Sequence, residues 1–199
     1  TGECEMYACR LVLMTMVRAL ILSGLGCAGT QTAPVPTATP EKLVNNKRAI
    51  QDYKMGIKQD PSRADTYKSR GDRYFRIGQY EQAIQDYDEA IRLDPRNSNA
   101  YIARGWAYAA LGRYERAIAD YDEVIRLDPK SAATFISRGS AYGVLEQFDR
   151  AIKDLDEATR LNPQYPVAYY LRGLIYEELG KSKEAERDFK KAKELGFTP

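Results

Sequence analysis

Residues Tyr101–Pro129 read YIARGWAYAALGRYERAIADYDEVIRLDP, and this stretch decides the fold because close variants of it recur on both sides. The same pattern occupies Tyr67–Pro95 (YKSRGDRYFRIGQYEQAIQDYDEAIRLDP), Phe135–Pro163 (FISRGSAYGVLEQFDRAIKDLDEATRLNP) and Tyr169–Phe197 (YYLRGLIYEELGKSKEAERDFKKAKELGF). The copies lie 34 residues apart, with no insertion or deletion between them. A fixed period of this length is the signature of a solenoid, in which each unit stacks only on its neighbours.

Within one copy, the apolar residues recur at helical spacing in two blocks, 101–111 and 114–127. Gly112 ends the first block because glycine tolerates the backbone of a tight turn. Asp128 and Pro129 end the second block because the residue before a proline is disfavoured in a helix. Each copy is therefore predicted to be a helical hairpin. Small residues should let its two helices approach closely: Gly71, Gly105, Gly139 and Gly173 on the first helix, and Ala83, Ala117, Ala151 and Ala185 on the second.

Several positions of the pattern together resemble the tetratricopeptide repeat. They are the aromatic residue that opens the first helix, the Gly-x-x-Tyr pair, the second-helix alanine, the aromatic residue four positions later and the closing proline. The resemblance covers about Ala64 to Pro199. It implies an all-α, right-handed α-solenoid of antiparallel helix hairpins with a concave face that binds proteins or peptides, and it implies no chemistry. Four units are expected at 64–97, 98–131, 132–165 and 166–199, preceded by a partial repeat helix at 41–63.

The resemblance also implies that the first helix of each unit lines the concave groove. The candidate partner-binding residues are Lys68, Phe75, Ile102, Trp106, Ile136, Tyr170 and Leu174. Their apolar members would form a larger exposed patch than monomeric proteins usually leave uncovered. We therefore expect an occupant: a helix or extended segment of a partner, a second copy of the chain, or this chain's own apolar amino-terminal segment. The alternative is that these side chains pack mainly on one another.

Some relatives hold the carboxylate end of a peptide with a Lys and Asn constellation. Here Lys68 is accompanied by Asp72 at the position of the asparagine. Because the Lys and Asn pattern is missing, we do not expect a receptor for peptide carboxyl termini.

Arginine and aspartate recur with the same period as the repeats. The arginines precede the first-helix glycines, and the aspartates lie on the second helices: Arg70, Arg104, Arg138 and Arg172, and Asp52, Asp86, Asp120, Asp154 and Asp188. We expect them to pair between neighbouring hairpins, with Arg104 on Asp86 or Asp120, because the guanidinium fork can hold a carboxylate by two hydrogen bonds. The alternative is a basic stripe that binds an acidic ligand.

The two ends of the repeat array differ in character. The last second helix is rich in lysine and glutamate and is expected to face water. At the other end, Glu41–Gln59 carries Ile50, Tyr53 and Ile57 with no preceding helix to cover all of them. This edge is therefore expected to be open to another protein or to a second copy.

Residues 1–28 form an apolar segment unlike the repeats, and 29–40 is a linker rich in proline and threonine. Leu11–Cys27 has the layout of a bacterial secretory signal, and Cys27 after Gly26 resembles the lipid-attachment cysteine of a bacterial lipoprotein. We expect an exported protein of the periplasm or outer membrane, attached to the membrane through this segment or a lipid on Cys27. The alternative is an uncleaved anchor or an amphipathic helix, although Arg18 makes a spanning helix unfavourable.

Composition argues against several functions. A net charge of +2, with acidic and basic residues interleaved, does not suggest a nucleic-acid surface. Histidine is absent and all three cysteines precede the repeats, so we expect no catalytic residues, no metal site and no cofactor. The sequence therefore predicts a protein-protein interaction scaffold that is not an enzyme. The alternative is a structural subunit that self-assembles into an oligomer or filament.

Overall fold

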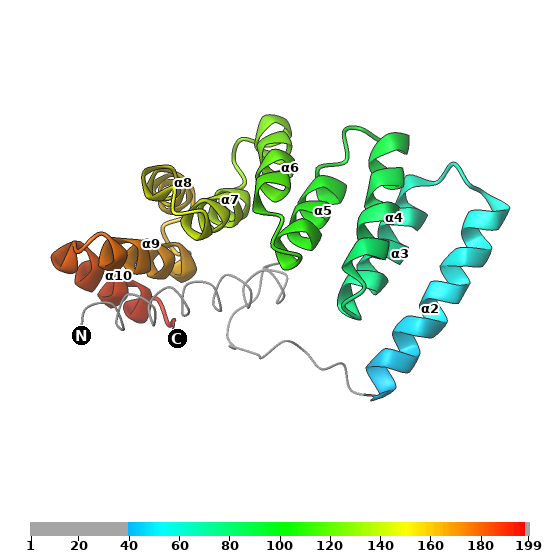
Figure 1. Cartoon of the computed structure of the whole chain (residues 1–199), viewed down its shortest axis with the longest axis horizontal. Coiled ribbons are helices and arrows are strands. Elements are labelled where there is room, and N and C mark those ends of the chain that lie inside the picture. The colour runs from blue at the N-terminus through cyan, green and yellow to red at the C-terminus, as the bar shows by residue number, and fades with distance from the viewer. Residues whose placement is uncertain (1–39, 198–199) are drawn as a thin grey trace. The chain divides into compact units, whose positions relative to one another are not determined.

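The computed structural model describes residues 40–197, and within this range the regular structure is helical with no strand. The helices follow one another along the chain, and those after α2 form helix pairs (Figure 1). They are α2 (Pro40–Gln59), α3 (Ala64–Arg76), α4 (Tyr80–Leu93), α5 (Ser98–Ala110), α6 (Tyr114–Leu127), α7 (Ala132–Val144), α8 (Phe148–Leu161), α9 (Pro166–Glu178) and α10 (Ser182–Glu194). The predicted all-α fold class is confirmed.

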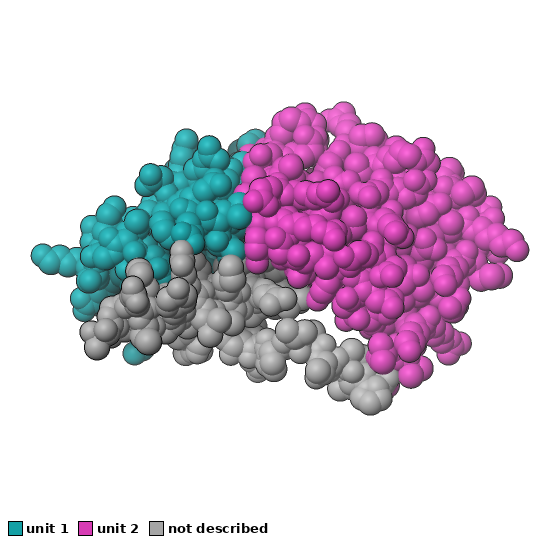
Figure 2. Space-filling model, viewed as in Figure 1, with its two compact units in different colours: residues 1–33, 128–199 teal, residues 34–127 magenta. Residues whose placement is uncertain are grey.

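The chain divides into two compact units, coloured separately in Figure 2. Unit 2 contains α2–α6, and unit 1 contains α7–α10. In unit 2, α3 pairs with α4 and α5 with α6, while α2 packs on α3 and α4 on α5. In unit 1, α7 pairs with α8 and α9 with α10, and α8 packs on α9. Within each unit, successive helix hairpins therefore stack on one another as in an α-solenoid.

The turn inside each hairpin requires a left-handed residue. Gly112 adopts a φ of 74° between α5 and α6, as a glycine can do without steric cost. The equivalent residue between α7 and α8 is Glu146, with a φ of 59°. A side chain in this region of backbone space costs roughly 1 kcal/mol, which the surrounding hairpin must offset.

The glycine of the first helix sets how closely the two helices of a hairpin approach. A Cβ atom on Gly105 would lie 2.6 Å from Cε1 of Tyr121, and one on Gly173 would lie 2.6 Å from Cε1 of Phe189. The aromatic ring of the second helix thus lies directly against the backbone of the first. The close approach that the sequence predicts is present in both units.

The periodic arginines pair with aspartates inside their own hairpins, so the expected pairing of these residues between neighbouring hairpins is wrong. In each hairpin, Nε and Nη2 of the arginine donate to the two carboxylate oxygens of one aspartate, over 2.6 to 3.0 Å. The pairs are Arg70–Asp86, Arg104–Asp120, Arg138–Asp154 and Arg172–Asp188. Of the two partners expected for Arg104, Asp120 is therefore correct and Asp86 is wrong, because Asp86 is held by Arg70.

Neighbouring hairpins are linked by a different aspartate. Nη1 of Arg104 donates to Asp88 of α4 over 2.6 Å, and Nη1 of Arg172 donates to Asp156 of α8 over 2.5 Å. Asp88 and Asp156 lie outside the arginine and aspartate series predicted from the sequence. At the position of α2 equivalent to Asp88 stands Lys54, which cannot accept such a bond from Arg70.

The amino-terminal predictions lie mostly outside the described residues. These are the signal-like segment 1–28, Cys27 and the linker 29–40 up to residue 39. The structure assigns Pro40 to the first position of α2 rather than to the linker, because a proline is tolerated in the first turn, where its missing N–H has no helical partner. Across residues 40–197, no helix combines the length and apolar character needed to cross a membrane.

Candidate protein-binding surface

The predicted groove residues of unit 2 lie on two first helices that contact each other, α3 and α5. Lys68 and Phe75 belong to α3, and Ile102 and Trp106 belong to α5. All four side chains are half-buried. Ile102 and Trp106 are four residues apart and therefore share one face of α5. Unit 2 thus presents large side chains that are accessible in part on adjoining helices.

The basic end of this surface is neutralised within the chain. Nζ of Lys68 lies 2.8 Å from Oδ2 of Asp72, one helical turn away. The Tyr87 hydroxyl donates to the other carboxylate oxygen, Oδ1, over 3.0 Å. Burial raises the pKa of Tyr87, and the neighbouring Asp72 carboxylate raises it further, so this hydroxyl stays protonated and acts as a donor. Asp72 therefore balances the charge of Lys68 within α3.

The next hairpin lacks this network because Trp106 takes the position of Asp72. Tyr121, the equivalent of Tyr87, is completely buried, and its hydroxyl has no hydrogen-bond partner within residues 40–197. Burial raises the pKa of Tyr121. A buried polar group left unpaired costs about 1 to 3 kcal/mol. Placing a tryptophan on this surface therefore carries an energetic cost for the hairpin beneath it.

The predicted groove residues of unit 1 are buried. Ile136 on α7 is 1% exposed, and Tyr170 and Leu174 on α9 are 9% and 5% exposed. Helices α7 and α9 contact each other, so the three residues belong to one packed region. In the described conformation, they are much less accessible than the groove residues of unit 2.

An aromatic cluster that the sequence analysis missed covers Tyr170. The ring of Phe197 lies 4.6 Å from that of Tyr170, and the ring of Phe189 lies 5.5 Å from it, measured between ring centroids. The chain after α10 is turned back by a hydrogen bond from the Phe197 N–H to the Ala192 carbonyl, 3.0 Å long. A signal was present in the sequence, since Phe197 stands where the other three copies have proline.

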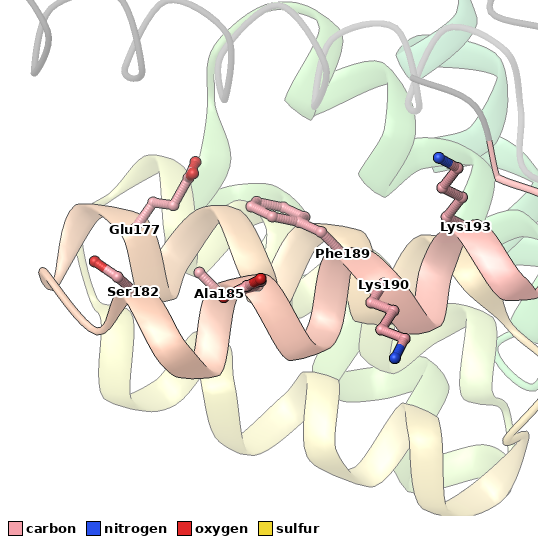
Figure 3. A pocket seen from close by; sticks show the side chains of 7 residues that line it. Glu177, Ser182, Ala185, Phe189, Lys190 and Lys193 are labelled. Atoms are coloured by element: carbon pink, nitrogen blue, oxygen red, sulfur yellow. The ribbon is translucent and has the colours of Figure 1, made fainter.

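Unit 1 also contains an open groove along α10 that the sequence analysis did not identify. Its volume is about 560 Å³, and Phe189 and Ala185 form its apolar floor (Figure 3). Charged and polar side chains surround this floor: Glu177, Ser182, Glu186, Lys190 and Lys193. In Figure 3, Glu177 and Ser182 lie toward one end of the groove and Lys193 toward the other.

Between residues 40 and 197, no group of three or more histidine, cysteine, aspartate or glutamate side chains could hold a metal ion. The conspicuous carboxylates, such as Asp120 and Asp188, are held by arginines in repeated structural pairs.

Comparisons with known proteins agree with the hairpin architecture. Family models described as tetratricopeptide repeat match residues 69–132 and 166–195, and a model described as TPR repeat matches residues 141–180. No curated protein matches the chain.

Several solved structures share the fold. A structure of MamA is 29% identical, with a TM-score of 0.73 over 78% of this chain and 91% of that chain. MamA from Desulfovibrio magneticus RS-1, from residue 41 to its end, is 21% identical, with a TM-score of 0.72 over 75% and 85%. YrrB, described as a TPR protein with an unusual peptide-binding site, is 19% identical, with a TM-score of 0.68 over 78% and 80%. The last two likenesses show the fold alone. Together with the family models and the repeated Gly and aromatic contacts, these findings show that the chain belongs to the tetratricopeptide repeat family.

Proposed function

We propose that this chain is a non-enzymatic scaffold that holds a peptide segment or helix of a partner protein against the first helices of unit 2. Membership of the tetratricopeptide repeat family supports protein binding as the general function. YrrB, which shares the fold, has a peptide-binding site. The observation that carries the proposal is the partial exposure of Phe75, Ile102 and Trp106 on the adjoining helices α3 and α5.

Trp106 is the proposed anchor of the partner. Large aromatic side chains that become buried at the centre of an interface dominate binding energies. Ile102 lies one turn away on the same helix face and would extend the apolar contact. Because Asp72 already neutralises Lys68, the partner is recognised by apolar side chains rather than by a terminal carboxylate. The burial of Ile136, Tyr170 and Leu174 leads us to assign the main contact to unit 2 rather than to unit 1.

Trp106→Ala is expected to weaken partner binding by about 2 kcal/mol, which is roughly a 30-fold increase in Kd. The measurement uses peptides selected against the full chain from a displayed library, with Kd determined by calorimetry for the wild type and the variant. Met55→Ala serves as a control, because Met55 is a large exposed apolar residue on α2 outside the proposed contact. An equal Kd for Trp106→Ala and the wild type would refute the proposed anchor.

Self-assembly into an oligomer or filament is the alternative function, for which the terminal helices provide the surfaces. The exposed side chains of α2 include Lys47, Arg48, Lys54 and Lys58, and those of α10 include Lys183, Arg187, Lys190 and Lys193. Both helices present more basic than acidic exposed residues, which disfavours stacking α10 of one copy on α2 of the next. Sedimentation equilibrium separates the two functions, because a mass that stays monomeric across concentrations excludes self-assembly.

We also propose that the scaffold is exported and tethered in a bacterial envelope, at the periplasmic side or the outer membrane. This proposal rests on the apolar segment Leu11–Cys27 and the Pro/Thr-rich stretch after it. A lipid on Cys27 would hold the repeats at the membrane through the Pro/Thr-rich stretch that follows it. Mass spectrometry of the Cys27-containing peptide from the natural host tests this, and an unmodified cysteine in a mature protein would exclude lipid attachment.

A further inference from the structure

The groove along α10 occupies the place where other hairpins receive the next helix. Its floor residues Ala185 and Phe189 are equivalent, by the 34-residue period, to Ala83 and Tyr87 of α4. In unit 2, Ala83 and Tyr87 pack with Ile84 against two small residues of α5, Ala103 and Ala107. The α10 groove therefore has the floor of a helix-docking surface.

The rim of the groove corresponds to the residues that bind the arginine of the next hairpin. Lys190 is equivalent to Asp156 of α8, and Lys193 is equivalent to Thr159. In unit 1, Nη1 of Arg172 donates to Oδ1 of Asp156 and to the Thr159 hydroxyl. In the α10 groove, two lysines replace these acceptors, so a repeat-type helix with its arginine would be repelled.

A third replacement reverses the character of the opposite end of the floor. Glu186 takes the position of Ile84 in α4 and Ile152 in α8. Glu186, Lys190 and Lys193 are all exposed. The groove thus keeps the small and aromatic floor of a helix-docking surface. Its charged rim, however, would repel the first helix of another repeat, which carries an arginine at this position.

We propose that the α10 groove docks a helix of a partner protein whose charges are the reverse of those in a repeat. The register follows from α5 on α4, where Arg104 reaches Asp88 and Ala107 packs in the cluster with Ile84. The partner helix therefore carries a carboxylate at the position of Arg104, facing Lys190 and Lys193. It carries a basic residue three positions later, facing Glu186, and small residues on the touching stripe. This surface is separate from the one proposed on α3 and α5.

The helix α5 itself supplies a probe for this groove. A fluorescein-labelled peptide spanning Asn97–Gly112, with Arg104→Glu and Ala107→Lys, has the required charges on a stripe of alanines. It retains Asn97, whose side chain accepts from the Ala100 N–H in the structure, and its new Glu and Lys pair supports the helix. The matched control peptide keeps the natural residues at both positions.

Fluorescence anisotropy with the full chain at low salt tests the assignment. The charge-reversed peptide is expected to bind about tenfold more tightly than the natural one, or better. Lys190→Asp restores the acceptor that a repeat-type helix uses, so in this variant the preference should reverse in favour of the natural peptide. Lys183→Asp makes the same charge change on α10 outside the groove and should leave the preference as in the wild type. Circular dichroism confirms that each variant is folded.

Several results would overturn the assignment. Failure of both peptides to reach half-saturation at millimolar chain excludes the charge-selective groove. Equal binding of the two peptides excludes it as well, and so does a Lys190→Asp variant with an unchanged preference. If Trp106→Ala abolishes binding of the charge-reversed peptide, this peptide binds the α3 and α5 surface and not the α10 groove. If the chain alone self-associates and Lys190→Asp abolishes this, the occupant is a second copy rather than a partner helix.

Discussion

Arg104→Ala is expected to lower the free energy of unfolding by about 3 to 5 kcal/mol, the cost typical of removing one partner from a buried ion pair. Arg104 binds both carboxylate oxygens of Asp120, over 3.0 and 2.6 Å, and its third nitrogen binds Asp88 of the preceding hairpin. The Asp120 side chain is only 5% exposed, so its carboxylate relies on these hydrogen bonds in place of water. Deleting the arginine leaves a buried carboxylate unpaired and also removes the link between the two hairpins.

The loss should depend on pH. Burial already raises the pKa of Asp120, while the hydrogen bonds and charge of Arg104 lower it. Without Arg104 the folded-state pKa rises further above the unfolded value, so the protonated side chain is favoured in the folded state. The deficit of the variant is therefore greatest above that pKa and becomes smaller as the pH falls toward the unfolded pKa of the aspartate. Urea unfolding followed by circular dichroism at neutral and acidic pH measures the difference in free energy of unfolding between the wild type and Arg104→Ala.

Arg126→Ala is the matched control for this prediction. Arg126 also binds a carboxylate through two nitrogens, that of Glu123, but its side chain is 65% exposed. Exposed pairs contribute about 1 kcal/mol or less, so this variant should be nearly as stable as the wild type. Equal losses in the two variants would show that the Arg104 pair is not structural. Loss of partner binding at unchanged stability would favour the alternative reading of the arginines as a ligand-binding stripe.

Gly105→Ala is expected to cost about 1 to 3 kcal/mol, as is usual for overpacking a tight interior. The new methyl group would lie 2.6 Å from Cε1 and 3.0 Å from Cδ1 of Tyr121. Tyr121 is completely buried, so its ring cannot move aside without disturbing its neighbours. Alanine otherwise stabilises a helix by about 1 kcal/mol relative to glycine, which offsets part of the loss. Thermal unfolding of both forms gives the difference.

The third hairpin supplies the control for Gly105→Ala. A Cβ on Gly139 would meet the Ala151 carbonyl and Cγ of Leu155 at 3.2 Å, a tight contact without severe overlap. Gly139→Ala should therefore cost less than Gly105→Ala. Tyr121→Leu, which copies Leu155, should rescue part of the loss when combined with Gly105→Ala. A Gly105→Ala variant as stable as the wild type would mean that the helices of this hairpin separate easily.

The arginine pairs show which contacts the repeat period predicts and which it does not. The shared period of Arg104 and Asp120 indicated that the two residues meet, because residues locked to one frame keep one relative position in each copy. The period left Asp86 and Asp120 equivalent as candidates. Their assignment, and the bond to Asp88, depend on which side chains the packing of α4, α5 and α6 brings within reach.

For the predicted groove residues too, periodicity predicted the helix face, whereas packing decided the exposure of the side chains. The helical spacing placed Ile102 and Trp106 on one face of one helix, and the structure leaves both half-buried. The same spacing placed Tyr170 on the equivalent face of α9, where Phe189 and Phe197 cover it. Their covering position results from a reversal of the chain after α10, which periodicity does not describe. The α10 groove was likewise absent from the sequence interpretation, although Lys190 and Glu186 depart from the repeat pattern.

By itself, the sequence determined the number of repeats, the hairpin in each of them, the close contact at glycines such as Gly105 and the family to which the chain belongs. These properties depend on interactions between residues near in sequence, whose spacing repeats without interruption. The tertiary structure alone decided which carboxylate each arginine holds, which predicted groove residues stay accessible and which residues line the α10 groove. These depend on contacts between helices, where a few ångströms of packing decide whether a side chain meets a partner, a neighbouring ring or water.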